Sequence, residues 1–348
     1  MRRVAKTRRE KGAIELIDGE KPAIGPNDCL IAPEHAGLCG SDAGIYKFKP
    51  AFEVMNLPTT IGHEYSGTVV ETGANVTAFE VGDRVIERPI RNCGTCYLCE
   101  TGNEHVCRDA AVTGVHHDGA YAEHIAVPED AIHPIPDDLS FKHAAVVEPT
   151  AVATRAVVHN ADVASGDRVL VEGPGPIGLL AAQVAAHQGA DVVVSGVGRD
   201  AVYRLPLAEE LGFETVNVAE RDLAAAVDEY TGGLGFDAVV DTTGHPSGLS
   251  DAADAVRNAG TIVVVGLSDE VSFDISPLVR SEVDIQCSYT YLYEDVERAV
   301  RLVNRGAIDV ERFVDDHYSL TDVDTAFKDF LAGETAKPLF DVSELRVA

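Results

Sequence analysis

The sequence contains few lysines and no long hydrophobic run, and each of these absences narrows what the protein can be. Eight of its 348 residues are lysine, and 28 Lys and Arg residues face 57 Asp and Glu residues, which gives a net charge of −29. An acidic surface repels the phosphate backbone, so we expect no nucleic-acid partner. No apolar stretch approaches the roughly 18 residues of a membrane-spanning helix, so we expect a soluble chain with no membrane partner.

A secretion signal is also missing, because the basic start Met1–Lys6 is not followed by an apolar stretch. We therefore expect a cytoplasmic protein. Internal repeats, low-complexity segments and long linkers are absent as well. The length exceeds what one compact core usually holds, so the default expectation is two domains that are joined tightly.

The acidic residues are spread along the chain rather than gathered in a tail, as the pairs Asp137-Asp138, Glu209-Glu210 and Asp315-Asp316 show. In dilute solution their mutual repulsion would destabilise the compact state. Concentrated salt shortens the Debye length to roughly 3 Å at 1 M and removes this penalty. The composition therefore predicts a halophilic protein.

Two adjacent metal-competent side chains, His63 and Glu64, follow an apolar approach and a glycine in the segment TIGHEY. Cys39, in GLCGSD, and Glu148, in VVEP, supply a thiolate and a carboxylate from distant parts of the chain. A sulfur ligand, an imidazole and carboxylates form a tetrahedral zinc site. We interpret these four residues as the ligands of one zinc ion, although a His-Glu pair alone is more often part of a surface turn.

A second cluster of possible ligands has the pattern C-x2-C-x2-C-x7-C and consists of Cys93, Cys96, Cys99 and Cys107. Four thiolates suit a closed structural zinc site. Disulfides are disfavoured by the cytoplasmic setting and by the close spacing, and iron–sulfur clusters use other cysteine spacings. Cys29 and Cys287 are not part of such a cluster, and we expect them to be buried apolar thiols rather than ligands.

The sequence pattern changes at about residue 152. Before it, β-branched residues and short turn signals predict a β-rich domain; after it, the pattern predicts alternating strands and helices. Arg168–Glu172 predicts a strand, and the segment GPGPIG predicts a turn into an Ala-rich helix that runs through Ala186. This glycine fingerprint in a strand–turn–helix setting binds the pyrophosphate of a dinucleotide. The residues concerned are Gly173, Gly175, Pro176, Ile177 and Gly178. Strands at 192–194, 236–240 and 261–265 complete a doubly wound parallel sheet.

The C-terminal segment offers a helix at 294–304 and a short tail that ends at 339–341. This stretch is too small for a core of its own, so we expect it to pack on the first domain. The predicted domains are therefore 1–151 with 289–348, which carries the zinc residues, and 152–288, which binds the dinucleotide.

With these motifs, the chain resembles the zinc-dependent medium-chain dehydrogenases over nearly its full length. It looks most like the sorbitol (polyol), threonine and sugar dehydrogenase branch, because of the segment GHEYSG and the pair Glu148-Pro149, where classical alcohol dehydrogenases have a cysteine. The resemblance implies an α/β protein with a β-rich GroES-like catalytic domain and a Rossmann domain. It implies a catalytic zinc held by Cys39, His63 and Glu64, with Glu148 either a direct ligand or exchanging with water and substrate.

The same resemblance implies a zinc-dependent NAD(P) oxidoreductase that oxidises a secondary or anomeric hydroxyl of a small polyol or sugar by hydride transfer. L-threonine 3-dehydrogenase is the alternative enzyme, and a non-catalytic NADP(H)-binding sensor or scaffold is the alternative of another class. Two zinc ions per chain, one catalytic and one structural, favour the enzyme. Relatives are dimers or tetramers, so we expect a homodimer or homotetramer. The apolar segments 261–265 and 283–288 could extend a sheet across a two-fold axis or be interior strands.

The proton relay departs from the pattern of the family. Ser41 occupies the hydroxyl position that would pass the proton of the substrate onward, although it could simply be a turn serine. Sorbitol- and threonine-type relatives often carry a histidine where this chain has Gly44. Water, His35, His116 or another histidine would then have to end the relay, and no replacement is evident.

The choice of cofactor depends on the end of the second strand of the dinucleotide domain. An NAD-selective site places a carboxylate there, but this chain has Gly196, so a 2′-phosphate would fit. Arg199 and Arg204 are placed to neutralise such a phosphate. Asp200 could instead swing in to hold a ribose. We therefore predict NADP, with NAD as the alternative.

Overall fold

The computed structural model of the chain describes residues 1–268 and 270–347, which group into two compact units. The first unit contains Met1–Glu148, Val314–Leu331 and the residues from Lys337 onward. The second contains Pro149–Phe313 and Ala332–Ala336. Each unit has its own architecture, so each is described by itself.

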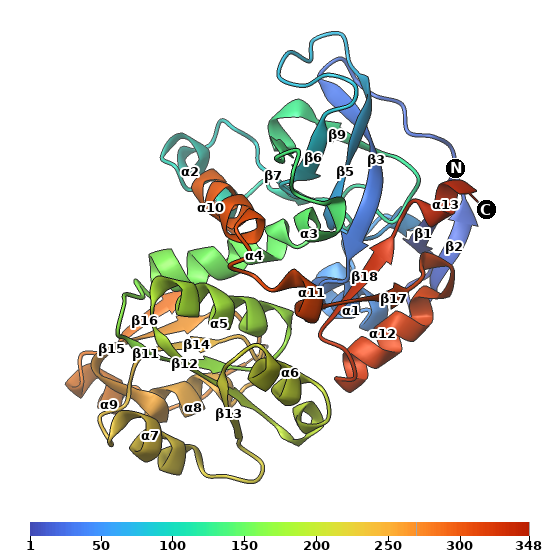
Figure 1. Cartoon of the computed structure of the whole chain (residues 1–348). Helices are drawn as coiled ribbons and strands as arrows, with labels where there is room; N and C mark the ends of the chain where they lie inside the picture. The colour runs from blue at the N-terminus through green and yellow to red at the C-terminus, as the bar shows by residue number, and fades with distance from the viewer. Residues whose placement is uncertain (269, 348) are drawn as a thin grey trace. The chain divides into compact units, whose positions relative to one another are not determined.

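The first unit is built from short, mostly antiparallel strands (Figure 1). Its main sheet has the order β10-β6-β5-β3-β18-β17, with β9 also paired to β3, and smaller sheets have the orders β2-β1-β4 and β7-β8. The strands are β1 (Arg2–Lys6), β2 (Ile14–Asp18), β3 (Asp28–Gly37), β4 (Thr59–Thr60), β5 (Glu64–Thr72), β6 (Arg84–Glu87), β7 (Ile90–Arg91), β8 (Ala111–Val112), β9 (Ile125–Pro128), β10 (Ile132–Pro134), β17 (Val314–Tyr318) and β18 (Lys337–Asp341).

Strand register decides which residues of this unit meet. Gly37 at the end of β3 pairs with Glu64 at the start of β5, and Leu339 of β18 pairs with Gly37 from the other side. Three distant stretches of the chain therefore converge at one end of the sheet. The helices of this unit are α1 (Gly40–Lys47), α2 (Tyr97–Glu100), α3 (Phe141–Ala144), α12 (Val323–Ala332) and α13 (Glu344–Val347). The first unit ends at Glu148, inside α4 (Val147–Thr154), and the rest of α4 groups with the second unit.

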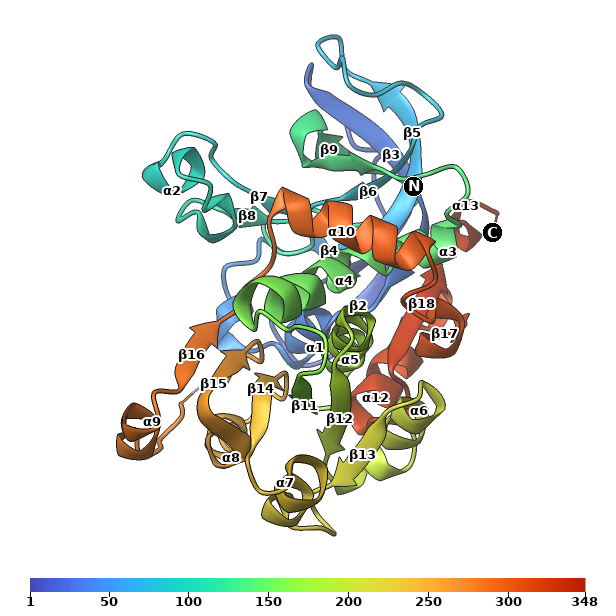
Figure 2. The ribbon, with the colours of Figure 1, turned by 60° about the vertical axis from the view of Figure 1, so that its left-hand side comes forward.

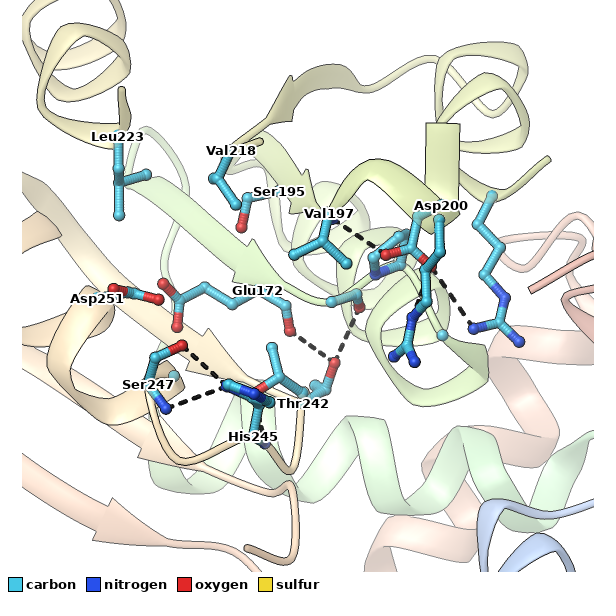
Figure 3. Close-up of a pocket in the computed structure, with 18 of the residues that line it drawn as sticks. Glu172, Ser195, Val197, Asp200, Val218, Leu223, Thr242, His245, Ser247 and Asp251 are labelled. Atoms are coloured by element: carbon cyan, nitrogen blue, oxygen red, sulfur yellow. Dashed lines mark hydrogen bonds and ion pairs between the residues drawn. The ribbon is translucent and has the colours of Figure 1, made fainter. Parts of the chain in front are cut away.

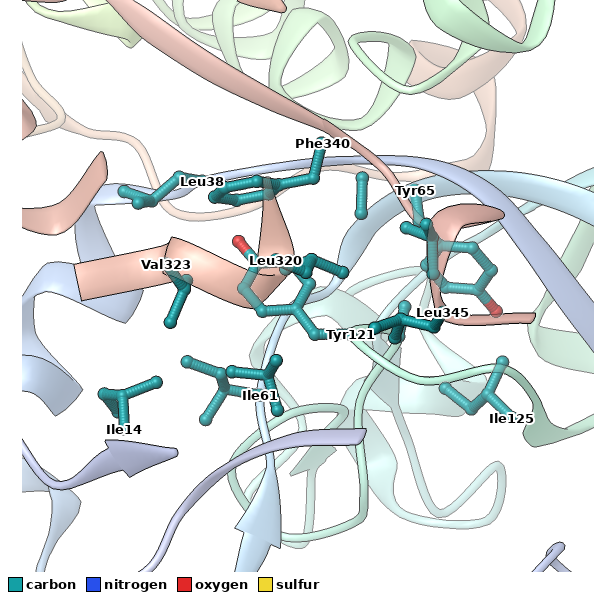
Figure 4. Close-up of a cluster of buried hydrophobic side chains, with 14 of the residues drawn as sticks. Ile14, Leu38, Ile61, Tyr65, Tyr121, Ile125, Leu320, Val323, Phe340 and Leu345 are labelled. Carbon is teal, nitrogen blue, oxygen red and sulfur yellow. The ribbon is translucent and has the colours of Figure 1, made fainter. Parts of the chain in front are cut away.

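The core of the first unit packs directly beneath this convergence point. Leu38, Ile61 and Tyr65 are at most 1% exposed and lie in one cluster with the rings of Tyr121 and Phe340 (Figure 4). The rings of Tyr121 and Phe340 meet edge to face at 5.2 Å. Since large buried side chains flank the candidate ligands in sequence, the backbone that carries those ligands is held by close packing.

The second unit is a parallel sheet of order β13-β12-β11-β14-β15-β16, in which every neighbouring pair runs in the same direction. Its middle strands are almost fully buried and rich in valine, as expected for a sheet that helices cover on both faces. The strands are β11 (Arg168–Glu172), β12 (Asp191–Gly196), β13 (Glu214–Asn217), β14 (Phe236–Asp241), β15 (Val256–Val264) and β16 (Asp284–Cys287).

The helices of the second unit lie on the two faces of this sheet, with α5 and α6 on one face and α7 and α8 on the other (Figures 1 and 2). Their bounds are α5 (Pro176–Gln188), α6 (Arg204–Glu210), α7 (Leu223–Thr231), α8 (Gly248–Ala255), α9 (Ser276–Arg280), α10 (Tyr293–Asn304) and α11 (Val310–Phe313). This doubly wound arrangement confirms the predicted Rossmann fold, and β11 has the predicted bounds.

The grouping of residues differs from the predicted domains at 149–151, 289–313 and 332–336, which all group with the second unit. Residues 289–313 group with the second unit, whereas the sequence predicts that everything after 288 returns to the first. Buried charge accounts for part of this difference, because Asp295 of α10 lies 3.0 Å from His159 Nε2 and 3.5 Å from Arg155 NH1, both in the same unit. Residues 314–331 and those from Lys337 onward group with the first unit.

The two isolated cysteines have different environments. Cys29 is fully buried on β3, as predicted, but Cys287 is exposed, so the prediction of a buried thiol is wrong there. The reason is that Cys287 ends β16, which lies at the edge of its sheet. Among the described residues, no helix is both long and apolar enough to cross a bilayer.

Candidate functional site

Cys39, His63 and Glu64 come together at the convergence point of the first unit. Each offers a ligand atom, and these atoms all lie within 4.8 Å of one another. Cys39 is the residue that caps the start of α1, and Glu64 begins β5. The turn before them requires a glycine, because Gly62 has φ 88° and a Cβ there would lie 2.3 Å from the ring of Tyr121.

Glu148, the fourth predicted ligand, is near this group but not part of it. It lies on α4, it is 8% exposed, and its charge acts on His63. Its oxygens are not in the set of ligand atoms within 4.8 Å. The geometry therefore brings together three of the four predicted ligands and leaves Glu148 beside them.

The electrostatics of the group favour a cation. Burial disfavours a charged imidazole, but the Cys39 sulfur, Asp42 and Glu148 outweigh burial and raise the pKa of His63 well above its ordinary value. A site that holds a proton this strongly also attracts a metal ion. One thiolate, one imidazole and one carboxylate, all from rigid elements, fit Zn²⁺.

Two residues that the sequence interpretation missed support this group. Asp42 is fully buried, its Oδ2 accepts the backbone N–H of Cys39 at 3.0 Å, and its Oδ1 lies 3.9 Å from His63 Nδ1. Lys337 is also fully buried, and its ammonium group contacts the Glu64 carboxylate and donates to Leu38 O at 3.1 Å. A signal for Lys337 existed, because a lysine in the apolar stretch KPLF is unusual in a chain with eight lysines.

Ser41 lies in the first turn of α1, two residues after Cys39. Its Oγ is buried and has no hydrogen-bond partner in the part of the chain that the structure describes. Gly44 is in the same helix, and a Cβ there would lie 2.5 Å from the ring of Phe52. The Phe52 ring therefore fills the space of a side chain at position 44, and a relay histidine there would require this ring to move. His116 caps a local turn, where its Nδ1 accepts the Val112 amide.

The four cysteines of the second cluster also meet. The sulfur–sulfur distances are 3.5 Å for Cys96–Cys99, 3.6 Å for Cys93–Cys107, 3.8 Å for Cys96–Cys107 and 3.9 Å for Cys93–Cys99. Four sulfurs at about 2.3 Å from a central zinc ion lie about 3.8 Å apart in a regular tetrahedron. The thiols are thus spaced for one metal ion. The backbone amides of Thr95 and Cys96 lower the pKa of Cys93 to about 6, which favours the thiolate that zinc binds.

The glycine fingerprint of the second unit lines a pocket of about 710 Å³ at the carboxyl ends of β11, β12 and β14 (Figure 3). Gly175 precedes α5, whose first residue is Pro176, so the helix N-terminus and the backbone of the turn are presented to a ligand. Ile177 follows in the first turn. At Gly178 a Cβ would lie 1.9 Å from Gly173 O, so only glycine allows the turn to pack this closely.

The two predicted phosphate-binding arginines line this pocket in different ways, next to Gly196. Arg204 is 7% exposed, and its Nε donates to Thr335 O at 2.9 Å while NH1 lies 3.7 Å from Asp200. Asp200 lines the same pocket and is 4% exposed; its Oδ2 accepts the Val197 amide at 3.1 Å, whereas its Oδ1 has no hydrogen-bond partner among the described residues. The Arg199 side chain is 65% exposed and is therefore the more mobile cation.

Two family profiles match these two regions of the sequence. Residues 25–137 match the alcohol dehydrogenase GroES-like domain, and residues 176–305 match the zinc-binding dehydrogenase domain. Together they cover more than half of the chain. The protein belongs to the zinc-dependent medium-chain dehydrogenase family. The predicted family and fold are thereby confirmed, and the protein is a dehydrogenase rather than an unrelated nucleotide-binding fold.

Characterised relatives of this dehydrogenase align over its whole length. A sorbitol dehydrogenase of Halalkalibacterium halodurans is 32% identical over 97% of this chain and 98% of its own. An L-threonine 3-dehydrogenase of Shewanella woodyi is 32% identical over 98% of this chain and 99% of its own. Sequence identity therefore does not separate the polyol and threonine branches.

Solved structures agree with this assignment. A zinc-binding dehydrogenase of Sinorhizobium meliloti bound to NADP superimposes with a TM-score of 0.88 at 28% identity, covering 98% of each chain. An alcohol dehydrogenase of Escherichia coli CFT073 complexed with NADH superimposes with a TM-score of 0.89 at 28% identity, covering 98% of this chain and 99% of its own. Solved structures with this fold thus include one bound to NADP and one bound to NADH.

Proposed function

We propose that this dehydrogenase oxidises a secondary or anomeric hydroxyl of a polyol or sugar by transferring hydride to NADP. The observation that carries the proposal is the buried group of Cys39, His63 and Glu64, whose ligand atoms lie within 4.8 Å of one another. A zinc ion bound there supplies Lewis acidity, which favours ionisation of a substrate hydroxyl near neutral pH. The polyol branch is supported by the sorbitol dehydrogenase among the relatives.

The residues of the chain have distinct parts in this proposal. Cys39, His63 and Glu64 would hold the metal, and Glu148, whose charge acts on His63, would serve as a further ligand or alternate with water and substrate. Asp42 fixes the Cys39 backbone, and it faces His63. Ser41 would relay the proton of the substrate hydroxyl: its Oγ accepts that proton while its own proton passes on through the cofactor ribose to water. The buried Oγ has no hydrogen-bond partner among the described residues and lies two positions from Cys39.

A second zinc ion belongs to the four-cysteine cluster in this proposal, and its part is structural. All four sulfurs are needed to complete a closed tetrahedron, so no position is left for a substrate. Metal analysis tests the assignment: two zinc ions per chain are expected. One zinc ion per chain, with dinucleotide bound but no alcohol oxidation, would instead indicate a sensor or scaffold.

The preference for NADP rests on charge at the end of β12. Gly196 leaves room beside the ribose, Arg199 is an exposed cation next to it, and Asp200 is engaged by Arg204 and the Val197 amide. A 2′-phosphate would gain charge-assisted hydrogen bonds from Arg199, with the buried Arg204 adding positive potential. Comparing kcat/KM for NADP and NAD is decisive, and a strong preference for NAD would refute the arginine argument.

L-threonine is the second candidate substrate, because an L-threonine 3-dehydrogenase is as similar to this chain as the sorbitol dehydrogenase is. Assays with sugars, polyols and threonine, each with both cofactors at molar salt, separate the two candidates. A kcat/KM for threonine above that for every polyol and sugar would overturn the first proposal and establish the second.

Assembly and location follow from surface features. We propose a homodimer or homotetramer in the cytoplasm. β16 lies at the end of its sheet, and the segment that precedes it carries the exposed apolar residues Leu267, Ile275 and Val279, which pairing with a second copy would help to cover. The thiol clusters need a reducing compartment. Light scattering at molar salt tests the assembly, and a monomeric mass at micromolar concentration would contradict it.

A further inference from the structure

The pocket of the second unit has a part that the phosphates and the ribose do not explain. The phosphates of a dinucleotide belong at the start of α5, beside Gly173 and Gly175, and the ribose belongs at the end of β12, beside Gly196. What remains of the pocket is lined by the apolar side chains of Val218 and Leu223 and by polar residues that include His245, Ser247 and Asp251. This remainder, which we call the base subsite, is where the adenine of the dinucleotide would lie.

A carboxyl group forms the floor of the base subsite. Glu172 is the last residue of β11, and it is 3% exposed. It pairs in register with Ser195 of β12 and Asp241 of β14, so it stands at the carboxyl edge of the sheet where the pocket opens. Figure 3 shows its side chain reaching into the pocket, with the carboxyl group toward Asp251.

This carboxyl group is not satisfied by the protein. Its Oε2 atom is buried and has no hydrogen-bond partner in residues 1–268 and 270–347. A buried polar atom without a partner costs free energy, about 1–3 kcal/mol in typical cases, so such an atom at a pocket floor indicates a ligand partner. A metal ion does not explain it, because Glu172, Asp241 and Asp251 do not form one of the metal-sized groups found in the described residues.

The protonation state of the group suits a purine. Burial, and then the nearby carboxylates Asp241 and Asp251, raise the pKa of Glu172 well above its ordinary value and so favour its protonated form. A protonated carboxyl group presents a donor and an acceptor side by side. Adenine presents the matching pair, a ring nitrogen that accepts next to an exocyclic amine that donates.

We propose that Glu172 reads the adenine base of the bound dinucleotide, donating one hydrogen bond to a ring nitrogen and accepting one from the exocyclic amine. The proposal rests on the dinucleotide binding of the proposed function and adds a specificity-determining residue to it. Val218 and Leu223 would pack on the base, and Glu172 would contact its edge. The Glu172 side chain thus allows the subsite to distinguish adenine from a base without the donor–acceptor pair.

The test compares NADP with its 1,N6-etheno derivative, in which the added ring removes the donor at N6. Calorimetry on the zinc-loaded protein at molar salt gives Kd for both ligands in wild type, Glu172→Gln and Glu172→Leu. Wild type is expected to bind the etheno derivative about tenfold or more weakly, since two hydrogen bonds are lost. Glu172→Gln keeps a donor and an acceptor, so it keeps most of this ratio.

Glu172→Leu distinguishes hydrogen bonding to the base edge from exclusion of the etheno ring by its size. It cannot bond the base edge, so NADP should bind about tenfold more weakly and the ratio of the two Kd values should approach one. Glu210→Gln removes an exposed carboxylate of α6 outside the pocket, and it serves as the control that keeps the wild-type ratio. Thermal melting confirms that each variant is folded.

The outcomes distinguish the two claims. An unchanged ratio in Glu172→Leu would show that the etheno ring is excluded by shape alone, and equal Kd values in wild type would show no base recognition; either result overturns the role of Glu172 while dinucleotide binding stands. If neither NADP nor NAD, nor their etheno derivatives, bind to wild type, the proposed function itself fails, and this inference fails with it.

Discussion

The two candidate metal centres of the first unit are built in opposite ways. The group of Cys39, His63 and Glu64 has mixed ligands that stand on β5 and at the start of α1, above a packed core. The four-cysteine cluster stands on a short lobe between β7 and β8, where Cys93 is exposed. The group of Cys39, His63 and Glu64 is held rigid by the packed core. The four-cysteine cluster becomes rigid only when its thiolates bind an ion.

This contrast has a chemical meaning. A centre that is already held by packing can leave a coordination position open for a substrate, because it does not need a full set of ligands to stay folded. A centre in a small lobe has little apolar surface to bury, so the metal itself must supply the folding free energy. Removal of a ligand from the group of Cys39, His63 and Glu64 should therefore affect catalysis. Removal of a ligand from the four-cysteine cluster should affect the local stability of its lobe.

Cys39→Ala has the largest expected effect. Loss of the thiolate should remove one of two zinc ions and lower kcat/KM by at least about 10³-fold, since both metal and proton chemistry are lost, while the melting temperature changes little. Zinc analysis and steady-state kinetics measure this. Cys287→Ser is the control, because Cys287 is an exposed thiol outside both clusters. Full activity in Cys39→Ala would end the assignment of the catalytic centre.

Lys337→Met tests the charge balance of the same centre. Removal of the buried ammonium leaves the Glu64 carboxylate without its cation, and breaking a buried pair costs about 3–5 kcal/mol. The loss in unfolding free energy should be greater after chelation than with zinc bound, because zinc also neutralises Glu64. Lys328→Met is the matched control, since Lys328 pairs with Asp324 at the surface and should matter little. Equal losses for both lysines would argue against a buried charge pair.

Cys96→Ser should change the lobe and spare the catalytic centre. One zinc ion is lost, residues 92–107 become sensitive to protease, and the unit as a whole keeps most of its stability because few core residues lie in the lobe. Limited proteolysis with mass analysis locates the cut. Cleavage elsewhere, or loss of both zinc ions, would show that the two centres are not independent.

Glu172 extends the comparison to a buried carboxyl group that lacks a cation. Because its folded pKa is raised, its contribution to stability is fully present below the pKa of the unfolded chain and is lost as pH rises through the folded pKa, by about 1.4 kcal/mol per unit of difference. Asp241 on β14, Asp251 on α8 and His245 in the pocket face this region and titrate with it. The free energy of unfolding of Glu172→Gln, measured by denaturant titration, should therefore fall less than that of wild type between pH 5 and 9. Parallel plots of this free energy against pH for the two proteins would refute the prediction.

A change in salt concentration should have the smallest effect on any single site, because it acts on the acidic surface as a whole. Both centres should keep their zinc across a salt series, while the melting temperature rises with salt because repulsion among 57 acidic residues is screened. Scanning calorimetry from dilute buffer to molar salt measures this. A melting temperature that is flat or falls would rule out a halophilic protein.

The parts of the structure that local sequence patterns control were predictable. The β11–α5 turn follows from glycine positions, and the clusters around Cys39 and Cys93 follow from residue types that have few other uses together. The parts that depend on long-range packing were not. Nothing near Gly44 in the sequence shows that the Phe52 ring fills its side-chain space, and nothing near Arg204 shows that Thr335 binds its guanidinium. The same holds for residues 289–313, whose grouping depends on the burial of Asp295.

The position of Lys337 along the chain sets the order in which the enzyme can mature. It lies 273 residues after Glu64, on a strand that joins the sheet beside β3. During synthesis Glu64 therefore emerges long before its counter-charge. The metal centre reaches its final charge state only after Lys337 has been made, so a chain truncated before Lys337 is expected to be defective in this centre although it retains every ligand.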